Sequence, residues 1–329
     1  MSTGTAAAIA NPNIALIKYW GNRDDALRLP ANGSISMNLD GLETRTQVAW
    51  HPASRQPHDT LTLNGSLITD ARLARVSAFL ALLRRMAGMD LRAEVVSENN
   101  FPAGTGIASS ASAFAALALA ASRSAGLDLA EAQLSRLARR GSGSACRSVP
   151  GGFVEWRMGG SDADSFAVSL APAAHWGLAD CIAIVSQEPK LTGSSEGHAL
   201  ASTSLVQAAR VADAPRRLEL CRAAILQRDF TALAAVTEQD SNLMHAVMMT
   251  STPPLFYWQE ATLAVMQEIR LARARGLAVC TTVDAGPNVH VICETAALEE
   301  TARLIGSIPG VREVRTAQVG GPARIVGSG

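Results

Sequence analysis

A glycine-rich stretch ahead of an expected helix is the part of the sequence that most clearly suggests a binding site. Residues 101–114 read FPAGTGIASSASAF, with Gly104 and Gly106 two positions apart and Ser109 and Ser110 before an alanine-rich run. Glycines let a backbone approach a ligand closely, and a helix N-terminus offers unpaired N–H groups to an anion. The stretch predicts a phosphate-binding loop, although the same residues also suit an ordinary glycine-rich turn that a serine caps at the start of a helix. It is neither a Walker A loop nor a dinucleotide fingerprint.

Three further groups of residues could act on a bound phosphate or on its acceptor. Asp284 stands where an expected strand meets the turn Asp-Ala-Gly-Pro-Asn, so it suits either a rigidly held base or a carboxylate that binds its own turn. Lys18 follows an apolar run, where it is either a site residue or an ordinary surface charge. The segment GSGSACR could hold a carboxylate or phosphate, or form a flexible connection, through Ser142, Ser144 and Arg147.

The remaining reactive side chains suggest no competing site. The six histidines are scattered without a ligand-like spacing, and no GxSxG elbow indicates a hydrolase. The five cysteines are also widely spaced, which predicts buried thiols in a reduced, cytoplasmic protein rather than a zinc or disulfide framework. We therefore assign no direct metal ligand from the sequence.

Length and charge restrict the classes of partner. With 329 residues, of which 48% are hydrophobic, the chain is long enough for two domains. Its 29 basic and 29 acidic residues balance, which argues against nucleic-acid and membrane partners. No apolar run reaches the length of a membrane span, and the N-terminus has no secretory signal pattern. A small anion pocket built from a few local cations remains compatible with this balance.

The elements that would position the candidate residues form an α+β pattern. In the first half we expect one strand over 6–20, a loop over 21–34, a hairpin at Asn64-Gly65, and helices over 70–87, 109–124 and 129–140. In the second half we expect a strand at 178–187, several helices, two strands within 278–294 joined by the turn 285–288, a helix at 296–307 and a strand at 312–319. The glycine-rich tail, residues 320–329, is expected to fray.

Four separated stretches resemble one family, in the same order along the chain. They are NIALIKYWGNRDDALRLPANGSIS, NNFPAGTGIASSASAFAALA, RRGSGSACRSVPGGFVEW and VDAGPN, which extend from about residue 10 to about residue 290. These stretches resemble the mevalonate diphosphate decarboxylases of the GHMP kinase superfamily. The resemblance implies an α+β, two-domain GHMP-kinase fold that forms a homodimer. It comprises a ribosomal-protein-S5-domain-2-like α/β domain at 1–178, a ferredoxin-like α/β sandwich at 179–329, and an active site in the cleft between them.

The resemblance further implies a decarboxylation that uses ATP and Mg²⁺. ATP would phosphorylate the C3 hydroxyl of a phosphorylated mevalonate, and phosphate would then leave as the carboxylate departs as CO₂. The matched positions imply that Asp284 faces the C3 hydroxyl, Lys18 steadies the phosphoryl group and Arg147 orients the carboxylate. The implied substrate-binding positions are Asn13, Tyr19, Asn22, Ser142, Ser144, Ser195 and Glu196, and the implied ATP-binding positions are Gly104, Gly106, Ser109, Ser110 and Lys190.

Two positions depart from the family's usual motifs and bear on the substrate. Asn22 replaces a lysine in the usual KYWGKR, and Glu196 replaces an arginine in the usual Ser-Ser-Arg. Formal charge at these positions falls from +2 (Lys and Arg) to −1 (Asn and Glu), which penalises a diphosphate more than a monophosphate. We therefore expect mevalonate 5-phosphate as substrate and isopentenyl phosphate as product. The alternatives are mevalonate 5-diphosphate, with Arg23, Arg28 or His198 as a replacement cation, and a mevalonate 3-kinase that does not decarboxylate.

Overall fold

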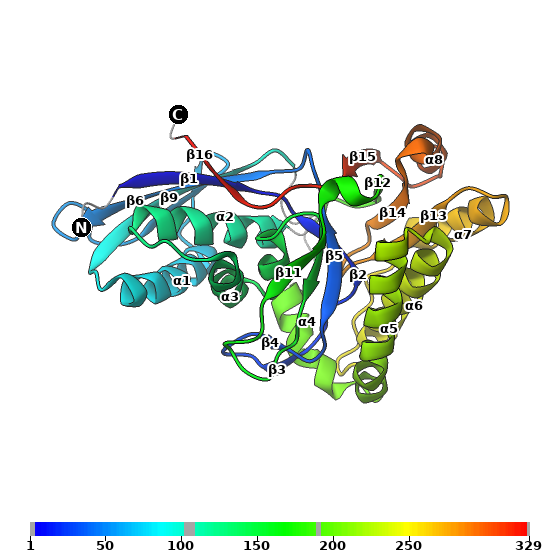
Figure 1. Cartoon of the computed structure of the whole chain (residues 1–329), viewed down its shortest axis with the longest axis horizontal. Coiled ribbons are helices and arrows are strands. Elements are labelled where there is room, and N and C mark those ends of the chain that lie inside the picture. The colour runs from blue at the N-terminus through cyan, green and yellow to red at the C-terminus, as the bar shows by residue number, and fades with distance from the viewer. Residues whose placement is uncertain (1–3, 102–108, 189–191, 328–329) are drawn as a thin grey trace.

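The computed structural model describes residues 4–101, 109–188 and 192–327, and it confirms the expected α+β class (Figure 1). The first half of the chain forms most of a six-stranded sheet and a four-stranded sheet, and the second half forms another four-stranded sheet with its own helices. The division after residue 178 stays a prediction, since β12 runs across that point, from Leu178 to Ile184.

Together with β16 (Arg324–Val326) from the end of the second half, the strands of the first half form a six-stranded sheet in the order β16-β1-β6-β9-β7-β8. They also form a four-stranded sheet in the order β11-β10-β5-β2 and the β3–β4 hairpin. These strands are β1 (Thr5–Ala10), β2 (Asn13–Ile17), β3 (Asn22–Asp24), β4 (Leu29–Pro30), β5 (Ser34–Asn38), β6 (Thr44–Pro52), β7 (Thr60–Leu63), β8 (Ser66–Leu67), β9 (Leu91–Asn99), β10 (Phe153–Trp156) and β11 (Ala167–Ala171). The accompanying helices are α1 (Ala71–Ala87), α2 (Ser109–Ser124) and α3 (Glu131–Gly141), with 3₁₀ helices at Gly143–Ser148 and Ala173–His175.

The second half builds a four-stranded antiparallel sheet in the order β13-β14-β12-β15. Its strands are β12, β13 (Val279–Val283), β14 (Val289–Glu294) and β15 (Glu313–Gln318), and the chain ends in β16 (Arg324–Val326). Its helices are α4 (Ser194–Leu200), α5 (Gln207–Gln227), α6 (Phe230–Met249), α7 (Glu260–Ala274) and α8 (Leu298–Gly306), with 3₁₀ helices at Ala201–Thr203 and Thr295–Ala297.

The single strand expected over residues 6–20 is wrong, because the chain breaks at Asn11-Pro12. Proline has no backbone N–H and cannot continue a ladder of strand hydrogen bonds. The Asn11 side-chain amide instead donates to the carbonyl of Leu42 at 2.8 Å. The break sends β1 into the six-stranded sheet and β2 into the four-stranded sheet, so that Lys18 emerges at the end of β2.

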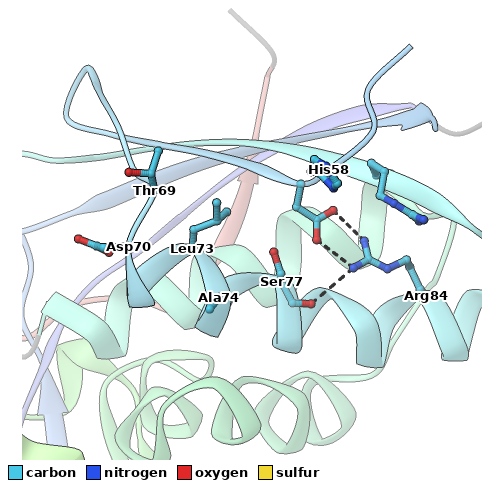
Figure 2. Close-up of a pocket in the computed structure, with 9 residues that line it drawn as sticks. His58, Thr69, Asp70, Leu73, Ala74, Ser77 and Arg84 are labelled. Atoms are coloured by element: carbon cyan, nitrogen blue, oxygen red, sulfur yellow. Dashed lines mark hydrogen bonds and ion pairs between the residues drawn. The ribbon is translucent and has the colours of Figure 1, made fainter. Parts of the chain in front are cut away.

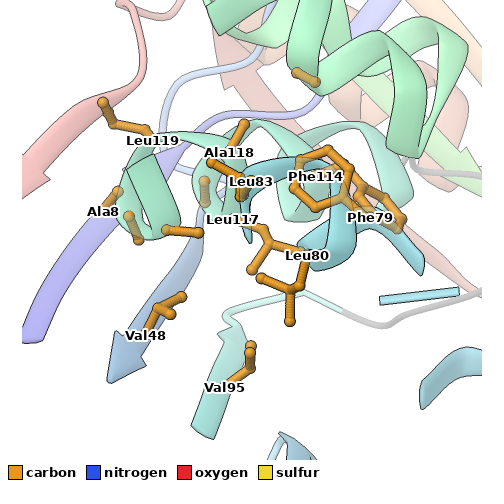
Figure 3. Packing of buried hydrophobic residues seen from close by; sticks show 14 of the residues in the cluster. Ala8, Val48, Phe79, Leu80, Leu83, Val95, Phe114, Leu117, Ala118 and Leu119 are labelled. Atoms are coloured by element: carbon orange, nitrogen blue, oxygen red, sulfur yellow. The ribbon is translucent and has the colours of Figure 1, made fainter. Parts of the chain in front are cut away.

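Helix α2 lies closely on the six-stranded sheet because its buried face consists of small residues. Six of its alanines have no exposed surface, and the helix contacts both β1 and β6. Figure 3 shows this packing, with Phe114 of α2 beside Phe79 of α1 in an edge-to-face contact of 5.4 Å between ring centroids. The buried residues of α2 begin at Ala111, so Ser109 and Ser110 lie at the less buried start of the helix.

Two local expectations about loops and ends have different outcomes. The hairpin at Asn64-Gly65 is confirmed: both residues have the positive φ that a primed turn requires, 47° and 78°. The fraying of the tail is wrong for β16, which pairs antiparallel with β1, Ala7 opposite Val326. The glycines that lead to β16 are also tied down, because the N–H of Gly320 donates to the carbonyl of Asn38 at 2.8 Å.

The two halves meet along the edge strands β2 and β13. The hydroxyl of Thr282 on β13 donates to the carbonyl of Ala15 on β2 at 3.2 Å, and α6 contacts both strands. One apolar cluster continues across this junction, from Ile14 on β2 to Ile182 on β12. The residues that follow β2 and β13 are therefore brought together. In the part of the chain that the structure describes, no helix is both long and apolar enough to cross a membrane.

Candidate active site

A buried ion pair joins the two halves of the molecule. Lys18 follows β2, and its Nζ donates a hydrogen bond of 2.5 Å to Oδ1 of Asp284, which follows β13. The Lys18 side chain is 2% exposed and that of Asp284 is 29% exposed, so the carboxylate is the member that a ligand can reach. Burial lowers the pKa of Lys18 below its ordinary value, and the Asp284 carboxylate opposes that shift. Lys18 is therefore a partner of Asp284 and not a surface charge.

Two buried charged side chains hold the backbone of Lys18, and sequence reasoning missed both. The Lys18 N–H donates to Oδ2 of Asp240 at 2.6 Å, and the Lys18 carbonyl accepts from Nη2 of Arg210 at 2.8 Å. Arg217 completes the arrangement by donating from Nε to Oδ1 of Asp240 at 2.7 Å. All three side chains lie in α5 and α6. The sequence of a helix does not indicate which of its charged residues are buried.

Arg147 is also buried, and its neighbours are polar rather than acidic. Its Nη1 donates to the hydroxyl of Ser34 at 2.6 Å, and its Nε donates to Oδ1 of Asn13 at 3.2 Å. Asn13 in turn donates to Ser148 Oγ at 2.8 Å and to the carbonyl of Ser144 at 3.2 Å. The structure thus brings Arg147, Asn13 and the backbone of Ser144 together as one hydrogen-bonded group. Ser34, on β5, is a member that the sequence did not indicate.

Tyr19 links this group to the loop that carries Asn22. Its hydroxyl donates to Oδ1 of Asn22, and its ring stacks on His198 at 4.1 Å between centroids. A Cβ at Gly143 would lie 2.7 Å from the Tyr19 hydroxyl, so this glycine permits the phenol to pack against the 3₁₀ helix 143–148. Burial raises the pKa of Tyr19 above its usual range, which keeps the phenol neutral and able to donate.

The start of α2 faces the serine segment that follows α3. The hydroxyls of Ser110 and Ser142 lie 3.3 Å apart. This approach depends on Gly141, because a Cβ there would lie 2.0 Å from Cδ1 of Phe114. Ser109, with Ser110, supplies the first turn of α2, whose N–H groups point away from the helix as an anion site would require. The expected ATP-binding residues Gly104, Gly106 and Lys190 lie outside the described residues.

Helix α4 borders the same region from the second half. A Cβ at Gly197 would lie 2.6 Å from Cη2 of Trp20, which shows how closely the helix packs on the segment after β2. His198 accepts a hydrogen bond from the N–H of Gly21 through Nδ1 at 2.9 Å. Glu196 is exposed in the first turn of α4, and Ser195 lies beside it in the same helix.

A separate pocket of about 400 Å³ lies between α1 and the strands β7 and β9 (Figure 2). Its most buried charges, Asp59 and Arg84, already satisfy one another through two hydrogen bonds of 2.9 Å. It contains none of the residues that the sequence singled out for chemistry. The reactive groups converge instead where the two halves of the chain meet.

Comparisons with known proteins agree with this arrangement. Residues 10–167 match the diphosphomevalonate decarboxylase-like N-terminal domain family, and residues 181–322 match the mevalonate 5-diphosphate decarboxylase C-terminal domain family. The chain is 38% identical to the diphosphomevalonate decarboxylase of Candida albicans, over 98% of this chain and 95% of the relative. It is 37% identical to that of Saccharomyces cerevisiae, over 94% of this chain and 84% of the relative.

Solved structures show the same fold. The mevalonate diphosphate decarboxylase of Staphylococcus aureus superposes with a TM-score of 0.93 and 35% identity, covering 98% of each chain. The enzyme of Enterococcus faecalis, described by its mevalonate diphosphate mediated ATP binding mechanism, gives a TM-score of 0.91 and 36% identity, covering 98% of this chain and 99% of that one. A further structure, described as MDDEF in complex with MVAPP, AMPPCP and magnesium, gives a TM-score of 0.92 at the same identity and coverage.

These relatives contradict the expected substrate. Mevalonate 5-phosphate was expected because Asn22 and Glu196 remove positive charge, yet the relatives are named for diphosphomevalonate. The error has a physical reason, since the charge count covered two positions only. In the structure Arg28, one of the replacement cations named from the sequence, and Arg75 donate to the carbonyls of residues 140 and 141 beside Ser142. The findings favour the diphosphate alternative, and the chain belongs to the diphosphomevalonate decarboxylase family.

Proposed function

We propose that this chain decarboxylates mevalonate 5-diphosphate at the expense of ATP, giving isopentenyl diphosphate. The observation that carries the proposal is the Lys18–Asp284 pair, which places one accessible carboxylate beside a buried ammonium at the junction of the two halves. Arg147, buried and without an acidic partner among the residues described, lies close enough for Asp284 to influence its pKa. A site with these charges suits an acidic substrate that also carries a reacting hydroxyl.

The first step is transfer of a phosphoryl group to the C3 hydroxyl. The hydroxyl oxygen attacks the γ-phosphorus of ATP, the bond to the β-phosphate oxygen breaks, and ADP leaves. Asp284 faces the hydroxyl and takes its proton or balances its charge, and Lys18 neutralises the phosphoryl oxygens in transit. Phosphoryl transfer depends mainly on positioning and charge neutralisation, which a rigid pair of side chains can supply.

The second step is elimination. The C3–O bond breaks and its electron pair leaves with phosphate, so positive charge develops at C3. The bond from the carboxylate carbon to C2 then breaks, its electrons form the C2=C3 double bond, and CO₂ departs. Asp284 stabilises the positive charge at C3, and Arg147 orients the carboxylate with Asn13 and Ser144.

The described residues fit ATP and Mg²⁺. The first turn of α2 offers N–H groups and the hydroxyls of Ser109 and Ser110 to phosphate oxygens. Within residues 4–101, 109–188 and 192–327, no group of three or more His, Cys, Asp and Glu side chains could hold a metal ion. Mg²⁺ usually binds through phosphates, waters and one or two carboxylates, and it would supply charge neutralisation for the transferred group. Gly104, Gly106 and Lys190 complete the proposed nucleotide site, and Ser195 the substrate site.

A homodimer and a cytoplasmic location are further parts of the proposal. The resemblance to the family supports the homodimer. The five cysteines are free and buried, which is compatible with a reducing compartment. Light scattering of the purified protein tests the dimer, since the mass of a single chain would contradict it.

A side-by-side assay tests the proposed function. The purified chain is given ATP and Mg²⁺ with either mevalonate 5-diphosphate or mevalonate 5-phosphate, and both ADP and CO₂ are measured. We expect a higher kcat/KM for the diphosphate and one CO₂ for each ADP. A higher kcat/KM for the monophosphate would overturn the substrate, and ADP without CO₂ would identify a kinase instead.

A further inference from the structure

The site has lost positive charge at two positions, and the local structure does not restore it there. The Asn22 side chain is engaged with its neighbours, since its Oδ1 accepts from Tyr19 and its Nδ2 donates to Asp25 at 2.7 Å. Glu196 is exposed in α4 and adds negative charge. A substrate diphosphate in this region therefore needs a cation from elsewhere in the chain.

Two of the candidate replacements are excluded by their surroundings. His198 uses Nδ1 to accept the N–H of Gly21, which requires that nitrogen to be unprotonated. Burial, the largest cause, and nearby guanidinium groups lower its pKa to about 3, so the ring is neutral near pH 7. Arg23 is exposed, and its Nη2 donates to the carbonyl of Met158 at 3.2 Å.

Arg28 carries a guanidinium group, unlike His198, and it is not fully exposed, unlike Arg23. It is half-buried at the tip of the β3–β4 hairpin, and its Nε donates to the carbonyl of Arg140 at 3.2 Å, at the end of α3. Its backbone has a φ of 51°, in the left-handed region that costs a non-glycine residue free energy. A non-glycine residue kept in this conformation is more frequent at functional sites than elsewhere.

The contacts of Arg28 place it beside the serine segment. Arg140 is followed by Gly141, whose carbonyl accepts from Nη2 of Arg75 at 2.7 Å, and then by Ser142, whose hydroxyl meets Ser110. Gly143 packs on the phenol of Tyr19. The charge of Arg28 also reaches Tyr19, where it opposes the rise in the pKa of the phenol. Arg28 thus borders the group of hydroxyls formed by Tyr19, Ser110 and Ser142.

The guanidinium groups in this region donate to backbone carbonyls and to a serine hydroxyl. Among the described residues, no ion pair connects Arg28, Arg75 or Arg147 to a carboxylate. Burial, the larger cause, and repulsion by the like charge of Arg28 lower the pKa of Arg75 to about 10. A ligand with several negative charges would relieve this repulsion, so the surplus itself indicates a polyanion site.

We propose that Arg28 binds the terminal phosphate of the substrate's diphosphate and thereby sets the preference for a diphosphate over a monophosphate. This inference rests on the proposed function, and it concerns the C5 end of the substrate, away from the Lys18–Asp284 pair. Arg28 is a binding residue for specificity, and it takes no part in the bonds that form and break.

The test compares Arg28→Leu with the matched control Arg23→Leu, which removes the same charge from the same hairpin. Loss of a charge-assisted hydrogen bond predicts a rise of about 10–100-fold in KM for mevalonate 5-diphosphate in Arg28→Leu. The KM for ATP and kcat should change less than about 3-fold, and Arg23→Leu should resemble wild type. The double variant Asn22→Lys with Arg28→Leu should recover part of the lost affinity, because it returns one cation to the same pocket.

A structural role for Arg28 would give another result. If Arg28 only supports the end of α3, then Arg28→Leu lowers Tm, raises KM for ATP as well, and gains nothing from Asn22→Lys; that pattern overturns the inference. Arg28→Gln, which keeps length and polarity, serves as a second variant if Arg28→Leu does not fold, and a wild-type KM for the diphosphate in it would likewise overturn the inference.

A binding measurement separates this inference from the proposed function. Inorganic pyrophosphate is titrated calorimetrically into the protein saturated with ADP, which occupies the nucleotide end. We expect pyrophosphate to bind wild type and Arg23→Leu at least about 10-fold more tightly than Arg28→Leu. Equal affinities for wild type and Arg28→Leu would refute the role of Arg28 even if the enzyme decarboxylates the diphosphate. A wild type that is inactive on the diphosphate would refute the proposed function alone.

Discussion

At the contact between Lys18 and Asp284, two charges are held together where each alone would be unfavourable. Burial removes nearly all of the water around the Lys18 ammonium, which destabilises its charge. The Asp284 carboxylate, 2.5 Å away, offsets part of this cost by electrostatic attraction. The remaining exposure of Asp284 leaves room for a ligand hydroxyl at the same carboxylate. Removing either charge should therefore affect catalysis more than substrate binding.

Asp284→Asn preserves the shape of the side chain and removes its charge. We expect kcat to fall by about 10²–10⁴-fold, with a small change in KM, because the carboxylate acts on the reacting hydroxyl. Release of ADP and of CO₂ should fall together, since the proposal uses Asp284 in both steps. Asp40→Asn, which changes an exposed carboxylate, should keep wild-type rates. An Asp284→Asn enzyme within about 3-fold of wild type would contradict the assigned role.

The lowered pKa of Lys18 predicts a loss of activity at alkaline pH. Because burial lowers this pKa below the ordinary 10.5, the ammonium deprotonates at a lower pH than a surface lysine does, and kcat should fall as its charge is lost. The same proton loss should not unfold the protein. The unfolded chain, with the higher pKa, binds more protons in that window, so the contribution of Lys18 to stability rises with pH.

Lys18→Arg provides the measurement for this prediction. Arginine stays protonated at every pH used, so the alkaline fall in kcat should move to higher pH or disappear, although the rate at neutral pH is lower. Circular dichroism at each pH separates inactivation from unfolding. An alkaline fall that is unchanged in Lys18→Arg would assign it to another group.

Helices α5 and α6 act on the site through the backbone of Lys18 rather than through the substrate. Asp240 binds the N–H of Lys18 and Arg210 binds its carbonyl, so both backbone groups of one residue are fixed by side chains that have almost no exposed surface. Arg217 in turn fixes Asp240. This network holds the backbone of Lys18 just after β2, from where its ammonium reaches Asp284.

Asp240→Asn should be costly for stability, and Asp213→Asn should not. Both aspartates pair with Arg217, but Asp240 is fully buried while the side chain of Asp213 is 39% exposed. Removing the buried partner leaves Arg210 without its carboxylate and leaves Arg217 only the partly exposed Asp213, so we expect a loss of about 3–5 kcal/mol in the free energy of unfolding. The exposed partner should contribute less than about 1 kcal/mol. Urea unfolding measures both, and equal losses would argue against the buried network.

Elements with a local signal could be predicted from the sequence, and elements held by distant partners could not. The Asn64-Gly65 hairpin and the helix after Asp70 follow from turn and cap chemistry, and Asp70 does accept the N–H of Arg72. The expected loop over 21–34 instead contains the β3–β4 hairpin. Likewise β16 forms only because β1 lies beside it, some 300 residues away in the chain.

The same distinction holds for the site. Lys18, Asp284 and Arg147 were identifiable by their type and by family motifs, and their catalytic roles stay predictions. Their pairing was not readable, because 266 residues separate Lys18 from Asp284. Asp240 lies in a helix, where acidic residues are usually exposed to solvent. Its burial follows from the packing of α5 and α6 against β2, which the sequence does not reveal.

Across the whole molecule, the two halves share one apolar core. The cluster that contains Ile14 and Ile35 of the first half continues through Ile182, Leu233 and Ile292 of the second, all of them at most 1% exposed. Cutting the chain after residue 178 would expose both faces of this cluster to water. It would also separate Asp240 from Lys18 and β16 from β1.

We therefore expect that neither fragment 1–178 nor fragment 179–329 folds alone, although each contains its own sheets. Burial stabilises by about 25 cal/mol per Å² of apolar surface, and the exposed junction would forfeit this contribution in both fragments. Each fragment should lack a cooperative thermal transition by circular dichroism, and a mixture of the two should regain the transition and some activity, with the full-length chain as control. A cooperative transition in either fragment alone would show that the shared core is dispensable, and that the halves are free to move as independent bodies during the reaction.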